Sequence, residues 1–410
     1  MKKELILLNL ITLGLLAGCG GSGGSGSDSG SGASNEQTSI ECVAKTQTVQ
    51  WQALLTENAA KLSDYQLFSS QCNPTTAPSE RGLAYDLSVP LFTDYASKYR
   101  FIFIPEGEKA TYVSGADTTI ENTDTGRVET NYIDDGTLDF PVGTVIVKTF
   151  SLPTNTNDRG FDNEKLIETR LLIHRESGWI GLPYVWNADK TDALFDDNGE
   201  LYRNTKLTHK GEQYTFTYGV PDFQKCSVCH SSGNEILPIG PKVRYLNMDY
   251  NYGDAVENQL ERWVAKGLLD DTNLPVRSER ESVSIFNDDI DLDNIQPEVL
   301  EGYAKSWLDI NCAHCHSSGG KASNTNMFVE YTRPFTDRSG HGVCSDPVSG
   351  AGAGYQYIIE PGNPARSLLI YRMSTQDSGD RMPPLGRDLI HNEGLALVTK
   401  WIERVDGSCN

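Results

Sequence analysis

"INCAHCHSSG", residues 310–319, repeats in outline an earlier stretch, "DFQKCSVCHS", residues 222–231. Both contain Cys-x-x-Cys-His, a spacing that suits a metal site, a redox disulfide or covalent attachment of a haem. Only nine cysteines and seven histidines occur among the 410 residues, so two chance matches would be very rare. The pattern is the attachment signature of c-type haems. The sequence therefore predicts two covalently bound haems.

The spacing of the motif follows from the chemistry of attachment. Cysteines three positions apart lie on one face of a helical turn, so both thiols can add to the two vinyl groups of one haem. The imidazoles of His230 and His316 then face the iron as proximal ligands. The predicted attachment residues are Cys226, Cys229, Cys312 and Cys315.

Two other chemistries also use paired cysteines. A zinc site would join both pairs as four soft ligands, but it does not require a histidine directly after each second cysteine. A thioredoxin-like dithiol needs one Cys-x-x-Cys within a βαβ pattern, and neither copy lies in such a pattern. Haem attachment is the better interpretation of both motifs.

The ligand at the sixth iron position separates electron transfer from catalysis. Met382, in "DRMPPLGR", follows the second motif and precedes two prolines that favour an extended loop. We predict Met382 as the distal ligand of the second haem, where a thioether raises the reduction potential. Met373 and Met327 are expected to be core residues, and His314 is expected to face solvent.

The first haem has a weaker candidate for its sixth ligand. Met248 follows His230 closely, in a loop that is short for a cytochrome c. His209, His174 or an open iron position are the alternatives. The sequence does not decide among these.

Helical periodicity surrounds the second motif but not the first. Apolar residues at three-four spacing predict a helix from about residue 297 into Cys312, and "NEGLALVTKWIERV" predicts a helix after Met382. Helix, motif, methionine loop and helix is the order of a class I cytochrome c. The first motif instead follows a strand-like stretch, "EQYTFTYGV", and precedes one helix, so this module looks truncated.

The segment before the motifs alternates like short strands separated by Gly, Pro and Asp turns. We therefore predict an α+β multidomain protein, in which an N-terminal β-rich sandwich or barrel precedes a mostly α-helical, class I cytochrome c-like diheme region. The predicted boundaries are 41–220 for the β-rich domain, 221–295 for the truncated first module and 296–410 for the second module.

The N-terminus predicts export and a membrane anchor. Residues 1–18 carry two lysines, an apolar run and the lipobox-like end "LAGC", so Cys19 is the predicted lipidation site. The Gly/Ser-rich residues 19–40 predict a flexible tether. Gly20 favours the outer membrane, with the periplasmic side and the cell surface both open. A net charge of −21 argues against nucleic-acid binding.

Four cysteines remain after the lipidated one and the two motifs. An even number in an exported chain predicts disulfides. Sequence does not determine the connectivity, but pairing within each predicted domain is favoured. The favoured pairs are Cys42 with Cys72 and Cys344 with Cys409.

With both motifs placed, the chain resembles a family of bacterial diheme c-type cytochromes, many of them lipoproteins. The segments that carry the resemblance are "YDLSVPLFTDYASKYRFIFIPEG", "FPVGTVIVKTF", "ETRLLIH", "LPIGPKVRYLN", "DINCAHCH" and "MPPLGR". The resemblance implies a redox protein with one haem on each motif. It names no substrate.

The expected function is electron transfer by a membrane-anchored, periplasm-facing diheme cytochrome. Its partner would be a redox protein, such as a periplasmic dehydrogenase or a respiratory cytochrome. The alternative is a diheme peroxidase or other haem oxidoreductase, with an open first haem and substrate bound by the β-rich domain. A carrier is favoured over an enzyme, because Met382 would leave the second iron no open position.

Overall fold

The computed structural model describes residues 48–69, 73–75, 78–79, 81–115, 118–122, 127–131, 136–232, 235–348 and 354–409. They all belong to one compact unit, residues 42–410. The predicted signal peptide, the tether, Cys19, Cys42 and Cys72 lie outside the described residues. Within the described ranges, no helix has both the length and the apolar character that crossing a membrane requires.

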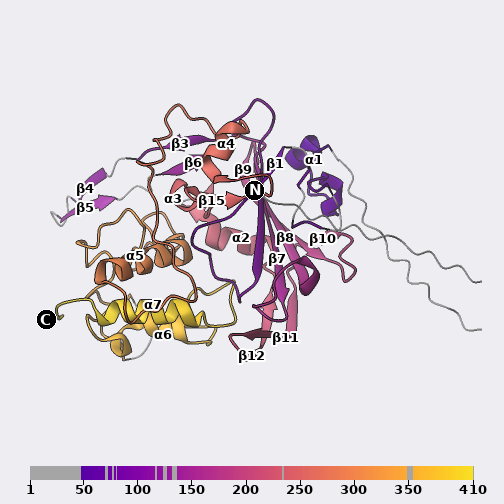
Figure 1. Cartoon of the computed structure of the whole chain (residues 1–410). Helices are drawn as coiled ribbons and strands as arrows, with labels where there is room; N and C mark the ends of the chain where they lie inside the picture. Colours follow the sequence, from indigo (N-terminus) through magenta and orange to yellow (C-terminus); the bar gives the residue numbers. More distant parts are fainter. Residues whose placement is uncertain are drawn as a thin grey trace, which may run out of the picture. The chain divides into compact units, whose positions relative to one another are not determined.

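A six-stranded antiparallel sheet forms the centre of this unit (Figure 1). Its apolar residues alternate between two faces, as strand geometry requires: Ile146 packs into one core cluster, while its neighbours Val145 and Val147 pack into another. Both faces are therefore buried. In sheet order the strands are β1 (Gly82–Tyr85), β2 (Ser97–Phe103), β7 (Val145–Pro153), β8 (Glu164–Arg175), β9 (Gly178–Trp186) and β10 (Ala193–Phe195).

The other described strands pair only two by two and do not extend the central sheet. The predicted sandwich or barrel is therefore wrong, because among the described strands no second sheet covers the first, and β1 and β10 remain as edges. The two-stranded pairs are β3 (Thr111–Val113) with β6 (Thr137–Asp139), β4 (Thr118–Asn122) with β5 (Arg127–Asn131), β11 (Leu201–His209) with β12 (Glu212–Gly219), β13 (Ser231–Ser232) with β14 (Glu235–Ile236), and β15 (Asp249–Asn251) with β16 (Val256–Asn258).

Helices and loops bury the two faces of the sheet. On one face, residues of α1 (Trp51–Thr56) and of the 3-10 turn η1 (Leu62–Tyr65) belong to the same core as β2, β7 and β8. On the other face, the core includes residues of α3 (Val243–Leu246) and α4 (Gln259–Ala265). The alternation of a strand shows that a face is buried, but it does not show which element covers it.

The prediction of a mostly helical, class I cytochrome c-like region is also wrong. Its longest described helices, α5 (Pro297–Leu308) and α7 (Asn392–Glu403), have 12 residues each, and much of the chain between them forms turns and loops. Those loops supply buried core residues such as Met327, Val343 and Ile359. Loop residues therefore fill core positions that further helices would fill in a helical domain. The remaining helical elements are α2 (Phe223–His230), η3 (Asp309–Ala313), η4 (Pro364–Arg366), η2 (Phe161–Asn163) and α6 (Leu368–Ser374).

Two helices nevertheless form where periodicity predicts them. α5 begins at Pro297, a residue that suits the first turn of a helix, and it runs through the π-helical η3 into the second motif. α7 packs against α5, where a Cβ on Gly394 would lie 2.4 Å from the Trp307 ring. Only glycine allows so close a contact. Figure 1 shows α5, α6 and α7 grouped together beside the sheet.

Candidate functional site

Each Cys-x-x-Cys-His motif lines a cavity of its own. Cys226, Cys229 and His230 line the first cavity, which holds about 1410 Å³ of space between its atoms, part of it open solvent. Cys312, Cys315 and His316 line the second cavity, which holds about 1090 Å³ counted in the same way. The structure therefore brings together the three predicted haem-binding residues of each motif.

The two cavities are neighbours with a common wall. The thiol of Cys315 in the second motif lies 3.8 Å from the carbonyl oxygen of Val228 in the first, close enough for a weak hydrogen bond. The motifs, far apart in sequence, are thus in direct contact. The residues that line both cavities are Trp307, Asn311, His314, Met373, Met382 and Pro383.

The first motif lies on α2, directly against the central sheet. Asp222 caps the helix by accepting a hydrogen bond from the Lys225 backbone N–H at 2.8 Å. Gly181 on β9 faces the motif, and a Cβ there would lie 3.0 Å from Cβ and 3.1 Å from Sγ of Cys226. A side chain at position 181 would therefore displace the first cysteine.

Both predicted proximal histidines are held by the same kind of hydrogen bond. Nδ1 of His230 lies 2.9 Å from the carbonyl oxygen of Leu237, and Nδ1 of His316 lies 3.3 Å from that of Met327. A carbonyl only accepts, so Nδ1 of His230 carries the proton and its Nε2 keeps a free lone pair. Nδ1 of His316 also lies 3.2 Å from the Thr325 hydroxyl, and the same tautomer lets it donate to both oxygens. Metal-ligating histidines typically have such a second hydrogen bond.

Burial keeps these groups uncharged. It lowers the pKa of His230 to about 4 and also lowers the pKa of His316, so both imidazoles are neutral near pH 7. It raises the pKa values of Cys226 and Cys229, that of Cys312 to about 12 and that of Cys315 to about 11. All four are free thiols. Protonated thiols are poor redox nucleophiles, which argues against the dithiol alternative.

The zinc alternative also fails on geometry. Among the described residues, one group of three or more histidine, cysteine or carboxylate ligand atoms lies within 4.8 Å of one another, and it contains no cysteine. The four sulfurs therefore do not converge on a common point. A tetrahedral zinc site requires that convergence.

The first cavity combines apolar walls with cations. Arg100 pairs with Asp86, and Arg170 binds Glu168 through two bonds of 2.7 and 2.6 Å. Lys148 has no carboxylate partner among the described residues, and burial together with Arg100, Lys98 and Arg170 holds its pKa well below the usual value. A carboxylate bound in this cavity would favour the charged form of Lys148. The cations lining this cavity are Arg100, Lys148, Arg170 and Arg387.

These features fit a haem. The macrocycle is apolar, two vinyl groups meet paired thiols, and two propionate carboxylates can neutralise the cations. The attachment chemistry that the motifs predict is thus matched by features outside the motifs.

Of the two methionines predicted as distal ligands, Met382 lines the second cavity and Met248 does not. Met382 lines the second cavity with His316, and its backbone is held by Arg372 at 2.9 Å and Arg387 at 3.1 Å. Met248 lies between α3 and β15 and lines neither cavity. Met373, predicted as core, belongs to the core and also lines both cavities.

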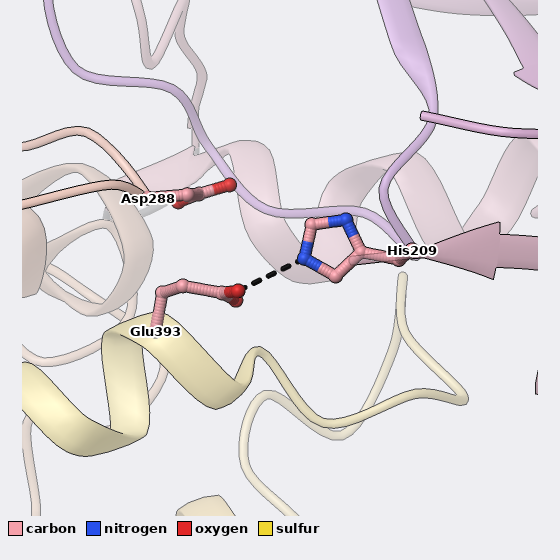
Figure 2. Close-up of side chains that lie close together, drawn as sticks. All are labelled: His209, Asp288 and Glu393. Atoms are coloured by element: carbon pink, nitrogen blue, oxygen red, sulfur yellow. Dashed lines mark hydrogen bonds and ion pairs between the residues drawn. The ribbon is translucent and has the colours of Figure 1, made fainter. Parts of the chain in front are cut away.

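The two histidines considered for the first haem also lie elsewhere. His174 stacks on Trp179 at 4.6 Å, and its Nδ1 lies 2.8 Å from the carbonyl oxygen of Phe140. His209 forms an ion-pair cluster with Asp288 and Glu393, whose side chains point toward one another from β11, a loop and α7 (Figure 2). Neither histidine lines the cavities.

The cluster of His209, Asp288 and Glu393 could hold a metal by its donor types, and Lys210 already offsets part of its negative charge. His209 Nε2 lies 2.9 Å and Lys210 Nζ 3.2 Å from Glu393 Oε1. Although burial opposes it, hydrogen bonds from His209 and Tyr95 lower the pKa of Glu393 to about 2. The Lys210 ammonium thus offsets the charge of Glu393, which a bound metal ion would otherwise do.

This cluster reaches the first cavity through His391. His391 Nε2 lies 3.2 Å from Asp288, and its Nδ1 accepts from Trp307 Nε1 at 3.2 Å. Both His391 and Trp307 line the first cavity. Sequence reasoning missed these residues, since they come from separate segments and carry no motif.

Cys344 and Cys409 form a disulfide, with an S–S distance of 2.00 Å and a Cα–Cα distance of 5.3 Å. The bond ties the chain end after α7 to a loop of the second cavity's core. This is one of the two pairings favoured from sequence, and the other lies outside the described residues.

Comparison with protein-family models, with curated proteins and with solved structures finds no match for this chain.

Proposed function

We propose that this chain binds two c-type haems covalently and transfers electrons between a redox partner and a downstream acceptor. One observation carries the proposal: each Cys-x-x-Cys-His motif lines its own cavity, and the two cavities share a wall. A diheme carrier needs both features, because electrons must pass between its two centres.

The residues of each motif have separate roles in this proposal. Cys226 and Cys229 would form thioethers to one haem, and Cys312 and Cys315 to the other. His230 and His316 would bind the irons through Nε2, since Nδ1 of each is held by a carbonyl. The bound haems supply reversible one-electron chemistry.

Met382 favours transfer over catalysis at the second haem. It lines the second cavity with His316. Two hydrogen bonds hold its backbone: its N–H donates to the Arg372 carbonyl oxygen, and its carbonyl oxygen accepts from Arg387 Nε. A thioether at the sixth position closes the iron to substrate and raises its potential.

The cellular setting follows from the N-terminus. Lipid on Cys19 and the Gly/Ser tether would hold the folded unit at a membrane, with the outer membrane favoured. A periplasmic dehydrogenase or a respiratory cytochrome would be the redox partner, and the net charge of −21 suits one with a basic docking face. The resemblance to diheme cytochrome lipoproteins supports this membrane-anchored setting.

A diheme peroxidase or other haem oxidoreductase is the second candidate. The observation in its favour is His391, which lines the first cavity and pairs with Asp288 at 3.2 Å. An imidazole paired with a carboxylate is a common acid–base group. This candidate requires an open iron at the first haem.

The test is expression in a host that matures c-type cytochromes, followed by intact mass and redox titration. We expect two haems, two reversible low-spin couples and no peroxide turnover. Cys226→Ser/Cys229→Ser and Cys312→Ser/Cys315→Ser should each lose one haem, whereas Cys344→Ser should keep both. A haem-free wild-type chain, from a host that matures a control cytochrome, would refute the proposal.

A further inference from the structure

His314 occupies a position that its sequence context does not suggest. It lies inside the second motif, where we expected a solvent-facing residue, yet it lines both cavities. Its Nδ1 is fully shielded from solvent and has no hydrogen-bond partner. A buried nitrogen without a partner costs free energy, about 1–3 kcal/mol in typical cases. Something that the polypeptide does not supply should satisfy it.

His314 lies beside the first motif as well as within the second motif. The next residue, Cys315, has its thiol 3.8 Å from the carbonyl oxygen of Val228 in the first motif. His230 is the proposed proximal ligand of the first haem. His314 therefore lies beside the first motif, and it lines the first cavity together with His230.

His391 and the two methionines that line the first cavity are less suited as iron ligands. Both nitrogens of His391 are taken, by Trp307 and Asp288. Met382 and Met373 line the second cavity too, where one of them is needed opposite His316. His314 is the remaining histidine among the described residues that line the first cavity.

We propose that His314 is the sixth iron ligand of the haem attached to Cys226 and Cys229. The inference rests on the proposed function and extends it. The first haem would then have two histidine ligands, one of them donated by the motif of the other haem. Because His314 and Cys315 are adjacent residues, the ligand of one haem and the thioether of the other would be joined by a single peptide unit. Such a link suits electron exchange within the pair.

The proposal also separates the two candidate functions. A first iron with two histidines has no open position for peroxide. It would also have a lower potential than an iron with a histidine and a methionine, because a thioether raises the potential. The first haem would thus have the lower reduction potential and the second haem the higher one.

The experiment is electron paramagnetic resonance and near-infrared magnetic circular dichroism of the ferric diheme protein. We expect one bis-histidine and one histidine–methionine signature. His314→Gly should convert the bis-histidine signal to high-spin while both haems remain by mass, and added imidazole should restore it. His314→Met should convert it to a second histidine–methionine signal.

A matched control is His341→Gln. His341 is also buried, with a shielded and unpartnered Nε2, but it lines neither cavity. Its substitution should leave both signals unchanged. If it abolishes the bis-histidine signal as His314→Gly does, the inference is wrong.

Single-haem variants keep the test decisive if His314 variants fail to mature. The bis-histidine signal must persist in Cys312→Ser/Cys315→Ser, which retains His314, and must vanish in Cys226→Ser/Cys229→Ser. Two haems with no bis-histidine signal in the wild-type protein overturn this inference but not the proposed function. A chain without haem overturns both.

Discussion

Gly181 on β9 and Cys226 on α2 approach so closely that a Cβ at position 181 would lie 3.0 Å from the Cβ and 3.1 Å from the Sγ of the cysteine. The sheet thus receives the first motif at a point where it has no side chain. Contacts this short are tighter than normal packing allows, so the position of the thiol depends on the glycine.

Gly181→Val is expected to impair haem attachment at the first motif, because the added side chain pushes Cys226 away from the sheet. Overpacking of this kind costs about 1–3 kcal/mol. Intact mass should show a fraction of chains with one haem, and peptide mapping should locate the loss at Cys226 and Cys229. Gly219→Val is the control, since the nearest atom to its Cβ is 3.6 Å away. Equal loss in both variants would argue against the contact.

Met382→Leu should remove the sixth ligand of the second haem. We expect loss of the methionine–iron charge-transfer band, cyanide binding by one haem and a lower potential for that haem, because the thioether stabilises ferrous iron. Visible spectra and redox titration measure these changes. Met248→Leu, outside both cavities, should leave the spectra unchanged. If Met373→Leu alone gives the effect, Met373 and not Met382 is the ligand.

Asp309→Asn should destabilise the protein strongly. Asp309 pairs with Arg244 at 2.9 Å, and both side chains are almost completely buried between α3 and the start of the second motif. Removing one member of a buried pair typically costs about 3–5 kcal/mol, and Arg244 would then rely on Glu281, at 3.5 Å, as its carboxylate partner. Denaturant unfolding of the haem-loaded protein measures the loss.

The exposed pair of Arg262 and Asp254, also 2.9 Å apart, provides the comparison. Asp254 has 64% of its side chain exposed, and Asp254→Asn should cost less than about 1 kcal/mol. Similar losses for the two variants would show that burial does not govern the contribution of the Asp309 pair.

Stability should fall in acid through Glu393. Hydrogen bonds from His209 and Tyr95 lower its folded pKa to about 2 from an ordinary 4.5. A lowered folded pKa stabilises the protein above the ordinary value, and this contribution is lost as the pH falls from about 4.5 toward 2. Glu393→Gln should therefore be less stable at neutral pH and should show a shallower acid limb in denaturant unfolding against pH.

Glu403→Gln, on the exposed face of the same helix, is the control for this pH dependence. It should retain the wild-type acid limb. If Glu393→Gln and the wild-type protein lose stability in parallel between pH 4.5 and 2, the His209–Glu393 bond does not control acid stability.

Local patterns were the reliable part of the sequence. The spacing within Cys226–His230 and Cys312–His316 brings the three predicted haem-binding side chains of each motif into one cavity, because residues so close in sequence cannot be separated by the fold. The helices that begin at Pro297 and Asn392 follow from local apolar periodicity in the same way. The haems, electron transfer and lipid anchor stay predictions.

Tertiary structure decided what lies next to these patterns. Periodicity marks a buried face without identifying what covers it, so both the sandwich or barrel and the mostly helical haem region were wrong. Met248 is close to His230 in sequence but not in the cavity, whereas His314 reaches the first cavity from another motif. Contacts between distant segments depend on how the whole chain packs, and no short stretch of sequence records them.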